Sequence, residues 1–527
     1  MIVSTLLSPT LLSDVAILLR RGVLGPALPH RTAGQVASLL AYGAGLFGEL
    51  RQAAKRAPNH LAIIDDEQQL TYDELLGLVE RTSGVLNGFG LGDTDRVGVL
   101  ARNHVGTLAA MAGVDAIGAD LVLLNTGLTP DQLVRIAADQ ELTAIVFDDE
   151  FAETVSGLDL ARISESDLAA RVPSVGRPWF LRPTRAGRTI VLTSGTTGTP
   201  KGARRPTPPG IGPLATILDR IPFNAGERML ISAPVFHTWG YAALQLALGT
   251  RATMVLQRVF DPAAARDALE TYGIHAHVAV PVMIQRMLEL PADHTARHRR
   301  SLRITALSGS ALPGGLASAY MNEYGDVLYN LYGSTEASWV SIATPEDLRR
   351  DPRTSGRPPR GTVVRILDDD GREVRPGEVG RIFAGNDLLF DGYTTGQTKE
   401  YIDGLMATGD LGSMRDGLVF VEGREDDMII SGGENVYPDE VQIALDRLDD
   451  IRECAVVGVP DDHFGQRLVA FIVLREGSDL TEEDAISFVK KQVARHAVPR
   501  EIHIIDELPR NATGKILSRE LRARLAE

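Results

Sequence analysis

The stretch Thr193–Gly202, which reads TSGTTGTPKG, decides how the rest of this chain is understood. It gathers glycines, hydroxyl side chains and one lysine into a short loop, directly after the apolar run Thr189–Leu192. The apolar run predicts a buried strand. A strand that enters such a loop is typical of a polyphosphate site, because glycines let amide N–H groups approach the oxygens while hydroxyls and a lysine add donors and charge.

The spacing of this loop differs from that of the Walker loop, which requires a Gly-Lys pair followed by serine or threonine. Here Pro200 precedes Lys201 and Gly202 follows it. The loop therefore predicts nucleotide binding of another kind. The alternative is a flexible surface loop, which would require a chance match to a dense pattern.

Length and composition limit the remaining possibilities. A chain of 527 residues is too long for one core, so we expect at least two domains. The net charge of -15 argues against nucleic acid as the main partner, since phosphate backbones favour a basic face. The single cysteine, Cys454, excludes an internal disulfide, and its apolar neighbours predict a buried structural thiol.

The N-terminus carries two apolar stretches. Leucines from Leu6 to Leu19 recur at helical spacing, and a second stretch runs from Val36 to Phe47. Neither reaches the ~18–20 apolar residues of a membrane span, and no basic region opens a signal peptide. We expect a cytoplasmic protein whose N-terminal helix packs on the protein's own surface. The alternative is an interfacial helix that contacts lipid, in a cytoplasmic protein at the inner face of a membrane.

From about Leu61 onward, short apolar strands such as Arg96–Leu100 alternate with helical periodicity, which predicts an α/β fold with largely parallel sheets. Thr71, with Glu74 in a capping box, and Thr129 are predicted to begin helices, and Glu482–Arg495 is predicted to be a charged helix. Turn residues crowd together after Gly356 and predict a small β-rich subdomain over about 357–422. The last hundred or so residues have their own pattern of strands and charged helices, which predicts a compact α+β domain. We therefore expect an N-terminal extension over 1–45, a large domain over 46–423 and a small domain over 424–527.

Four further motifs carry chemistry. They are LYGSTEA from Leu331, MATGDLG from Met406, GREDDMIISGGENVYP from Gly423 and PRNATGKI from Pro509. Glutamate in the first could ligate Mg²⁺, and aspartate in the second could accept hydrogen bonds from a ribose. Each motif alone also fits an ordinary turn.

Together with the first loop, and in this order, these motifs resemble the adenylate-forming superfamily of acyl- and aryl-CoA synthetases, peptide-synthetase adenylation domains and beetle luciferases. The resemblance runs from about Leu46 to the C-terminus. It implies two parallel-rich α/β sheets and a small β-barrel-like subdomain, followed by a small mobile α+β domain. It also implies ATP, Mg²⁺ and coenzyme A.

The resemblance assigns roles to individual residues. The ATP- or AMP-binding residues it implies are Thr193, Ser194, Gly195, Thr196, Thr197, Gly198, Lys201, Gly309, Ser310, Ala311, Tyr332, Gly333, Ser334, Asp410 and Arg424. Thr335 would contact the α-phosphate and Glu336 would bind Mg²⁺. Lys515 would be the mobile catalytic lysine, while Lys201 would only bind phosphate.

The small domain of such CoA ligases rotates between two half-reactions. The resemblance places the hinge at Asp426 and a pantetheine passage at Gly432 and Gly433. Glycine-rich neighbours such as Gly423 make a pivot there plausible.

The substrate is less well specified. His237, in PVFHTWGY, falls where many acyl-CoA ligases carry a histidine near the carboxylate, and Trp239 could line the acyl pocket; both could equally be packing residues. We expect a CoA ligase for a medium- to long-chain fatty acid. The alternatives are an aryl-acid CoA ligase, a ligase that loads a carrier protein, and a luciferase-like oxygenase. A homodimer is also compatible with the sequence.

Some positions depart from the family pattern. Met406 and Ala407 replace the usual aromatic and basic residues before Thr408, which puts one phosphate-side contact in doubt. Gln442 stands where glutamate is common. The loop from Arg204 is rich in proline and lacks the usual histidine.

Overall fold

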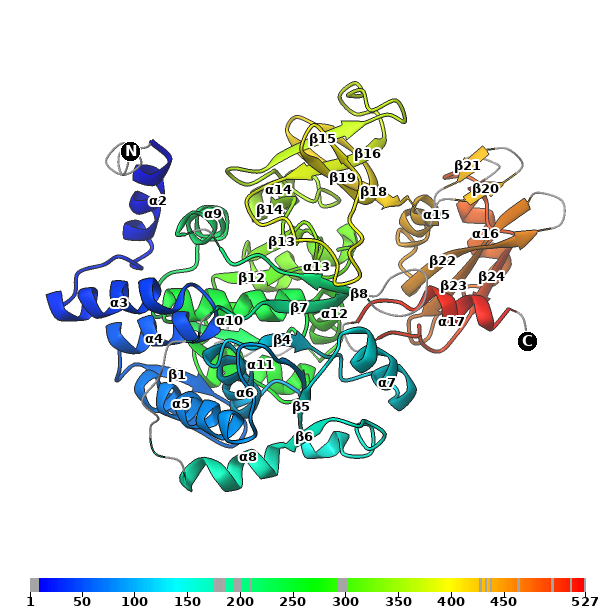
Figure 1. Ribbon diagram of the computed structural model, residues 1–527. Helices are drawn as coiled ribbons and strands as arrows, with labels where there is room; N and C mark the ends of the chain where they lie inside the picture. Colours follow the sequence, from blue (N-terminus) through cyan, green and yellow to red (C-terminus); the bar gives the residue numbers. More distant parts are fainter. Residues whose placement is uncertain are drawn as a thin grey trace.

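The computed structural model describes residues 9–174, 176, 183, 185–193, 201–208, 210–291, 301–425, 429–431, 434–436, 438–461, 465–493, 497–511 and 514–525. A large N-terminal part built on two sheets stands beside a smaller C-terminal part, coloured orange to red in Figure 1. The predicted α/β class is confirmed.

Two largely parallel sheets form the large part. The eight-stranded sheet has the order β14-β13-β12-β11-β9-β10-β1-β2 and the six-stranded sheet the order β6-β5-β3-β4-β7-β8. The first contains β1 (Leu61–Ile64), β2 (Gln69–Thr71), β9 (Arg228–Ile231), β10 (Thr253–Leu256), β11 (Ala276–Ala279), β12 (Ile304–Leu307), β13 (Leu328–Tyr332) and β14 (Ser341–Ala343). The second contains β3 (Arg96–Leu100), β4 (Asp120–Leu123), β5 (Ala144–Phe147), β6 (Ala161–Ser164), β7 (Thr189–Thr193) and β8 (Lys201–Arg204).

The main core contains side chains from both sheets and from the helices α4 (Leu46–Arg56), α5 (Tyr72–Gly88), α6 (Val105–Ala116) and α10 (Thr238–Thr250). Leu50, Leu86, Met111 and Leu244 are fully buried there. Helices α6 and α10 are apolar nearly all round, which is the pattern of helices covered on every side.

Helix starts follow the predicted capping chemistry. Thr71 caps α5 and forms a capping box with Glu74, as expected from the sequence. Thr129 caps α7 (Pro130–Asp139) in the same way. The remaining helices of the large part are α8 (Glu165–Arg171), α9 (Gly212–Arg220), α11 (Pro262–Thr271), α12 (Pro281–Leu288), α13 (Gly314–Tyr324) and α14 (Pro345–Arg350).

Two five-stranded sheets follow. One contains β15 (Val363–Leu367), β16 (Gly380–Gly385), β17 (Tyr401–Ile402), β18 (Leu405–Arg415) and β19 (Leu418–Arg424). The other contains β20 (Ile429–Ser431), β21 (Glu434–Val436), β22 (Ile451–Asp461), β23 (Gly465–Leu474) and β24 (Glu501–Ile504), with helices α15 (Pro438–Leu445), α16 (Glu482–Val489) and α17 (Ser518–Ala523). Cys454 on β22 is buried, as predicted.

Helix α16 is shorter than the sequence predicts. We expected it to reach Arg495, but it ends at Val489. The amide of Lys491 bonds to Phe488 O and that of Gln492 to Val489 O, so the chain tightens into a turn after the helix.

The N-terminal helices α2 (Pro9–Arg20) and α3 (Pro29–Tyr42) pack on the protein's own surface, α2 against α9 and α3 against α4, as expected. Leu18 of α2 is buried in the main core, and Asp14 forms an ion pair with Arg360. Leu12 and Leu40 remain exposed. In the described part of the chain, no helix has the length and apolarity needed to cross a membrane.

Candidate active site

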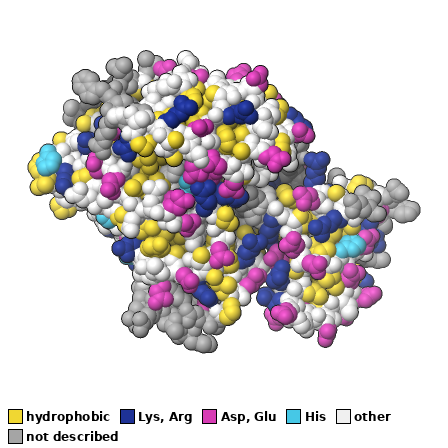
Figure 2. Space-filling view, turned by 90° about the horizontal axis from the view of Figure 1, so that it is seen from below, with side chains coloured by type: hydrophobic (Ala, Val, Ile, Leu, Met, Phe, Trp, Pro, Cys, Tyr) yellow, Lys and Arg dark blue, Asp and Glu magenta, His cyan; other side chains and the backbone are white. Residues whose placement is uncertain are grey.

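A cavity of about 540 Å³ lies where the large part meets the C-terminal part. Its wall includes one side of α10, the segment after β13, and the turn that carries Lys515. On the face shown in Figure 2, the two parts stand side by side with a furrow between them. The cavity therefore draws its polar groups from segments far apart in the sequence.

The segment after β13 presents Thr335 and Glu336 to this cavity. Gly333 permits the tight turn, because a Cβ there would lie 2.0 Å from Ser338 O. Arg205 supports the turn through Nη1, which donates to Thr335 O at 2.8 Å and to Ser338 Oγ at 2.9 Å. Burial lowers the pKa of Arg205 to about 10, which leaves it charged at neutral pH.

Glu336 is buried at the cavity wall. Its Oε1 accepts a hydrogen bond of 2.7 Å from the Tyr393 hydroxyl, and its backbone carbonyl accepts one from Phe390 N. Lys201 Nζ lies 5.6 Å from the centre of the Tyr393 ring, on the same wall. The carboxylate is thus held in place, and its second oxygen accepts no hydrogen bond from the residues that the structure describes.

Lys515 reaches the cavity from the far end of the chain. Asn511 Oδ1 accepts from Lys515 N at 2.9 Å, and Arg510 Nη1 donates to Gly514 O at 2.7 Å while Nη2 pairs with Glu453 on β22. These contacts anchor both ends of the turn to the C-terminal part. The turn also touches the large part, because a Cβ on Gly514 would lie 2.4 Å from Val282 Cγ1.

His237 and Trp239 stand at the start of α10. Burial, helped by the nearby charge of Lys515, lowers the pKa of His237 to about 4, so its imidazole is neutral at physiological pH. Trp239 lines the cavity and donates its indole N–H to Ala279 O at 3.1 Å. It is therefore a packing residue and a cavity wall at once. Thr238 Oγ1 lies 2.8 Å from Thr335 Oγ1, which joins the start of α10 to the segment after β13.

A second cleft of about 900 Å³ adjoins the first and shares Lys515, Gly309 and Arg424 with it. Asp410 lines this cleft, accepting hydrogen bonds from the Tyr332 hydroxyl at 2.6 Å and from Arg424 Nη1 at 3.2 Å. Burial raises the pKa of Asp410 above its ordinary value, against the opposing effects of Arg424, the Tyr332 hydroxyl and Lys399.

Most of the site residues named from the sequence meet at these two cavities. The residues that line at least one of them are Thr193, Lys201, His237, Trp239, Gly309, Ser310, Ala311, Tyr332, Gly333, Ser334, Thr335, Glu336, Asp410, Arg424 and Lys515. The positions Ser194, Gly195, Thr196, Thr197, Gly198, Asp426, Gly432 and Gly433 lie outside the described residues. Their roles stay predictions.

The sequence did not reveal three charged residues of the site. Arg205 supports the turn at Thr335, Lys399 lines the first cavity and acts electrostatically on Asp410, and Glu49 lines the far end of the first cavity. Of these three residues, only Lys399 could have been found from the sequence. Ala407 lacks the usual basic side chain, and its amide bonds to Glu400 O, so the neighbouring Lys399 reaches the same region.

Lys399 and Arg424 lie against the same glycine. A Cβ on Gly409 would be 3.4 Å from Lys399 Nζ and 3.3 Å from Arg424 Nη2. We expect Lys399→Ala to raise the KM for ATP about tenfold, the value of one charge-assisted contact, with a smaller effect on the KM for the acid. Pyrophosphate release measures both constants. Lys490→Ala, at an exposed position on the other side of the C-terminal part, is the control. An unchanged KM for ATP would remove Lys399 from the nucleotide site.

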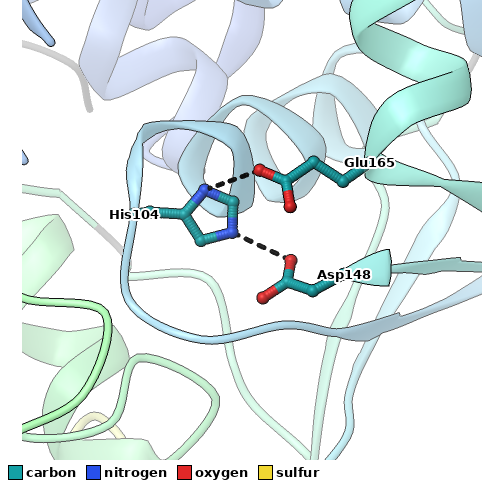
Figure 3. Close-up of side chains that lie close together, drawn as sticks. All are labelled: His104, Asp148 and Glu165. Carbon is teal, nitrogen blue, oxygen red and sulfur yellow. Dashed lines mark hydrogen bonds and ion pairs between the residues drawn. The ribbon is translucent and has the colours of Figure 1, made fainter. Parts of the chain in front are cut away.

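A second polar cluster, shown in Figure 3, brings together His104, Asp148 and Glu165. His104 Nδ1 accepts from Gly106 N at the start of α6, so Nε2 carries the proton and donates to Asp148 Oδ1 at 2.8 Å. Arg258 pairs with both carboxylates. The Arg258 guanidinium already supplies the positive charge that a metal ion would bring, so we interpret the cluster as structural. It joins the two parallel sheets.

Comparison with known proteins agrees with this geometry. Residues 50–394 match the AMP-binding enzyme family, and residues 440–515 match the AMP-binding enzyme C-terminal domain. The chain is 31% identical over 492 residues to the indoleacetate–CoA ligase of Aromatoleum aromaticum, covering 89% of this chain and 96% of that protein. It is 32% identical over 479 residues to a feruloyl-CoA synthase of Amycolatopsis, covering 89% and 97%.

A solved structure is also similar. The ATP-bound MatB of Rhodopseudomonas palustris superposes with a TM-score of 0.83 at 26% identity, over 92% of this chain and 99% of that one. The family matches cover most of the chain, and the motifs that they contain converge on the two cavities described above. The chain therefore belongs to the AMP-binding enzyme family, within the adenylate-forming superfamily.

Proposed function

We propose that this protein is an AMP-forming acid–CoA ligase. The observation that carries the proposal is the meeting of Lys515 with Thr335, Glu336 and His237 at one cavity, beside a cleft lined by Asp410 and Tyr332. A cleft with a buried aspartate suits a nucleoside, and a cavity with an apolar wall suits an acid. The relatives named above are CoA ligases, which supports the choice of acceptor.

In the first half-reaction, a carboxylate oxygen of the acid attacks the α-phosphorus of ATP. The bond from the α-phosphorus to the bridging oxygen breaks, so acyl-adenylate forms and pyrophosphate leaves. Two anions must approach each other, so catalysis depends mainly on position and positive charge. Lys515 and Lys201, which both line the cavity, supply that charge. The neutral His237 can donate one N–H to the acid without competing for its proton.

The residues present fit a magnesium ion. Glu336 offers a carboxylate held by Tyr393, with one oxygen still available at the cavity. Carboxylate oxygens are the ligands that Mg²⁺ prefers. When bound there, the ion would neutralise charge on the departing pyrophosphate.

In the second half-reaction, the thiol sulfur of CoA attacks the acyl carbonyl carbon, the bond from that carbon to the phosphate oxygen breaks, AMP leaves, and the thiol proton is released to water. Lys515 lines the same cavity as Thr335 and Glu336 in this structure, which fits the adenylating arrangement. We infer that the C-terminal part moves before the thiol can approach, with the predicted hinge at Asp426.

The first cavity favours an acid with an apolar body. Leu214, Ile217, Trp239 and Leu246 form much of its wall. The sequence indicated a medium- to long-chain fatty acid, whereas the relatives named above act on indoleacetate and ferulate. Glu49 at the far end disfavours a plain alkyl terminus, because an apolar group there would face a carboxylate whose hydrogen bond from Gln52 satisfies only part of its acceptor capacity. We therefore place aryl acids and acids of medium length ahead of long alkyl chains.

One assay tests the proposal. Pyrophosphate release and thioester formation are measured with cinnamate, indoleacetate, octanoate, dodecanoate and palmitate, each with and without CoA. We expect pyrophosphate release with at least one acid and conversion of that acid to its CoA thioester. Accumulation of acyl-adenylate without any thioester would overturn the choice of CoA as acceptor. Preference for palmitate would overturn our ranking of the acids.

A further inference from the structure

We propose that Glu49 recognises a hydrogen-bond donor, a hydroxyl or N–H group, at the end of the acid that lies farthest from its carboxylate. This inference rests on the proposed function, since it concerns the acid of the same reaction. It names a feature of the substrate that the catalytic motifs do not specify.

The position of Glu49 follows from helix α10. Thr238, Ala242, Gln245 and Gly249 line the cavity at helical spacing, so one side of α10 forms its long wall. Thr238 contacts Thr335 at the catalytic end. Eleven residues further on, at a rise of ~1.5 Å each, Gly249 lies about 16 Å away along the helix.

Glu49 stands at this second end. A Cβ on Gly249 would lie 3.8 Å from Glu49 Oε2. Gln52 Nε2 donates to the same carboxylate oxygen at 3.0 Å and also lies 3.2 Å from Leu248 O, so the amide locks Glu49 against the end of α10. The cavity therefore runs from the catalytic groups to a carboxylate.

A side chain on another helix fixes the position of helix α4. Gly45, its N-cap residue, offers no side chain, and Phe47 N instead donates to Asp115 Oδ2 on α6 at 2.9 Å. This fixes the start of α4 one half-turn before Glu49. The carboxylate is thus held directly by Gln52, while Asp115 fixes the start of its helix, as a specificity group requires.

Glu49 lacks a cationic partner within the described part of the chain, where its only side-chain hydrogen bond comes from Gln52. Burial raises the pKa of this carboxyl to about 7. The C-terminal end of α10 adds partial negative charge nearby. A donor on the ligand would give the carboxylate a second hydrogen bond, whereas a methyl group would leave it facing apolar atoms with Gln52 as its only donor among the described residues.

The test uses pairs of acids that differ only in the distal donor. These are para-coumarate with cinnamate, and ω-hydroxy fatty acids from octanoate to tetradecanoate with their parent acids. For the wild type we expect the hydroxylated member of the best-fitting pair to have a kcat/KM about ten- to a hundredfold higher. The parent series also shows which length places the hydroxyl at Glu49.

Glu49→Leu should abolish this preference and increase kcat/KM for the parent acid, which a merely structural role would not do. Glu49→Gln keeps the shape and an acceptor, so part of the preference should remain. Lys55→Gln, at an exposed position on the same helix, is the control and should behave like the wild type. If thioester formed equally well from both members of every pair, or if Glu49→Leu kept the wild-type preference for the hydroxylated acid, the role of Glu49 would be overturned and the proposed function would stand. Absence of thioester with every acid would overturn the proposed function instead.

Discussion

Lys515→Ala is expected to reduce acyl-adenylate formation by ~10²–10³, the loss caused by removing one preorganised donor to a developing charge. The reason is geometric. Lys515 reaches the cavity that holds Thr335 and Glu336, and within the described residues its side chain makes no hydrogen bond or ion pair that would explain it as structural. Pyrophosphate release in the absence of CoA measures the loss.

The same variant should still convert added acyl-adenylate to the thioester, because the charge is needed only while pyrophosphate leaves.

Gly514→Ala provides an independent test. Gly514 has φ +78° and a Cβ would lie 2.4 Å from Val282, so the turn must shift and withdraw Lys515. We expect this variant to lose adenylation and to retain thioester formation. Equal loss of both half-reactions in Lys515→Ala would show that the lysine has another role.

Much of the fold could be predicted from the sequence, because local signals agreed with the tertiary structure. The capping residues Thr71 and Thr129 begin helices as expected, and the run Arg96–Leu100 is β3 with the predicted bounds. The motif residues also meet in space, because strand ends and turns of the α/β part open onto the same cavities.

The sequence did not indicate which other side chains enter the site. Lys399 and Arg205 belong to segments without a motif, and only the chain path brings them to Gly409 and Thr335. Glu49 resembles any polar residue on an amphipathic helix until α10 is placed beside it. The predicted end of α16 was also wrong. Charged residues after Val489 continue the helical pattern of the sequence, but the backbone turns there.

Glu336→Gln is expected to reduce adenylation by ~10², and to shift its dependence on magnesium to higher concentration. Glutamine has the same shape, and its carbonyl oxygen can still accept the hydrogen bond from Tyr393, so the fold around Phe390 should not change. What disappears is the negative charge of the second oxygen, the group that we propose for Mg²⁺. Adenylation rates measured across a magnesium titration check this.

Tyr393→Phe separates the charge of Glu336 from its position. It leaves the carboxylate charged and removes only the hydroxyl that holds Oε1 at 2.7 Å. One hydrogen bond of about 1 kcal/mol corresponds to a loss of about fivefold, so this variant should be impaired much less than Glu336→Gln. Its magnesium titration should stay close to that of the wild type. If instead Glu336→Gln kept the wild-type magnesium dependence while losing activity, Glu336 would act on the turn at Thr335 and not on the ion.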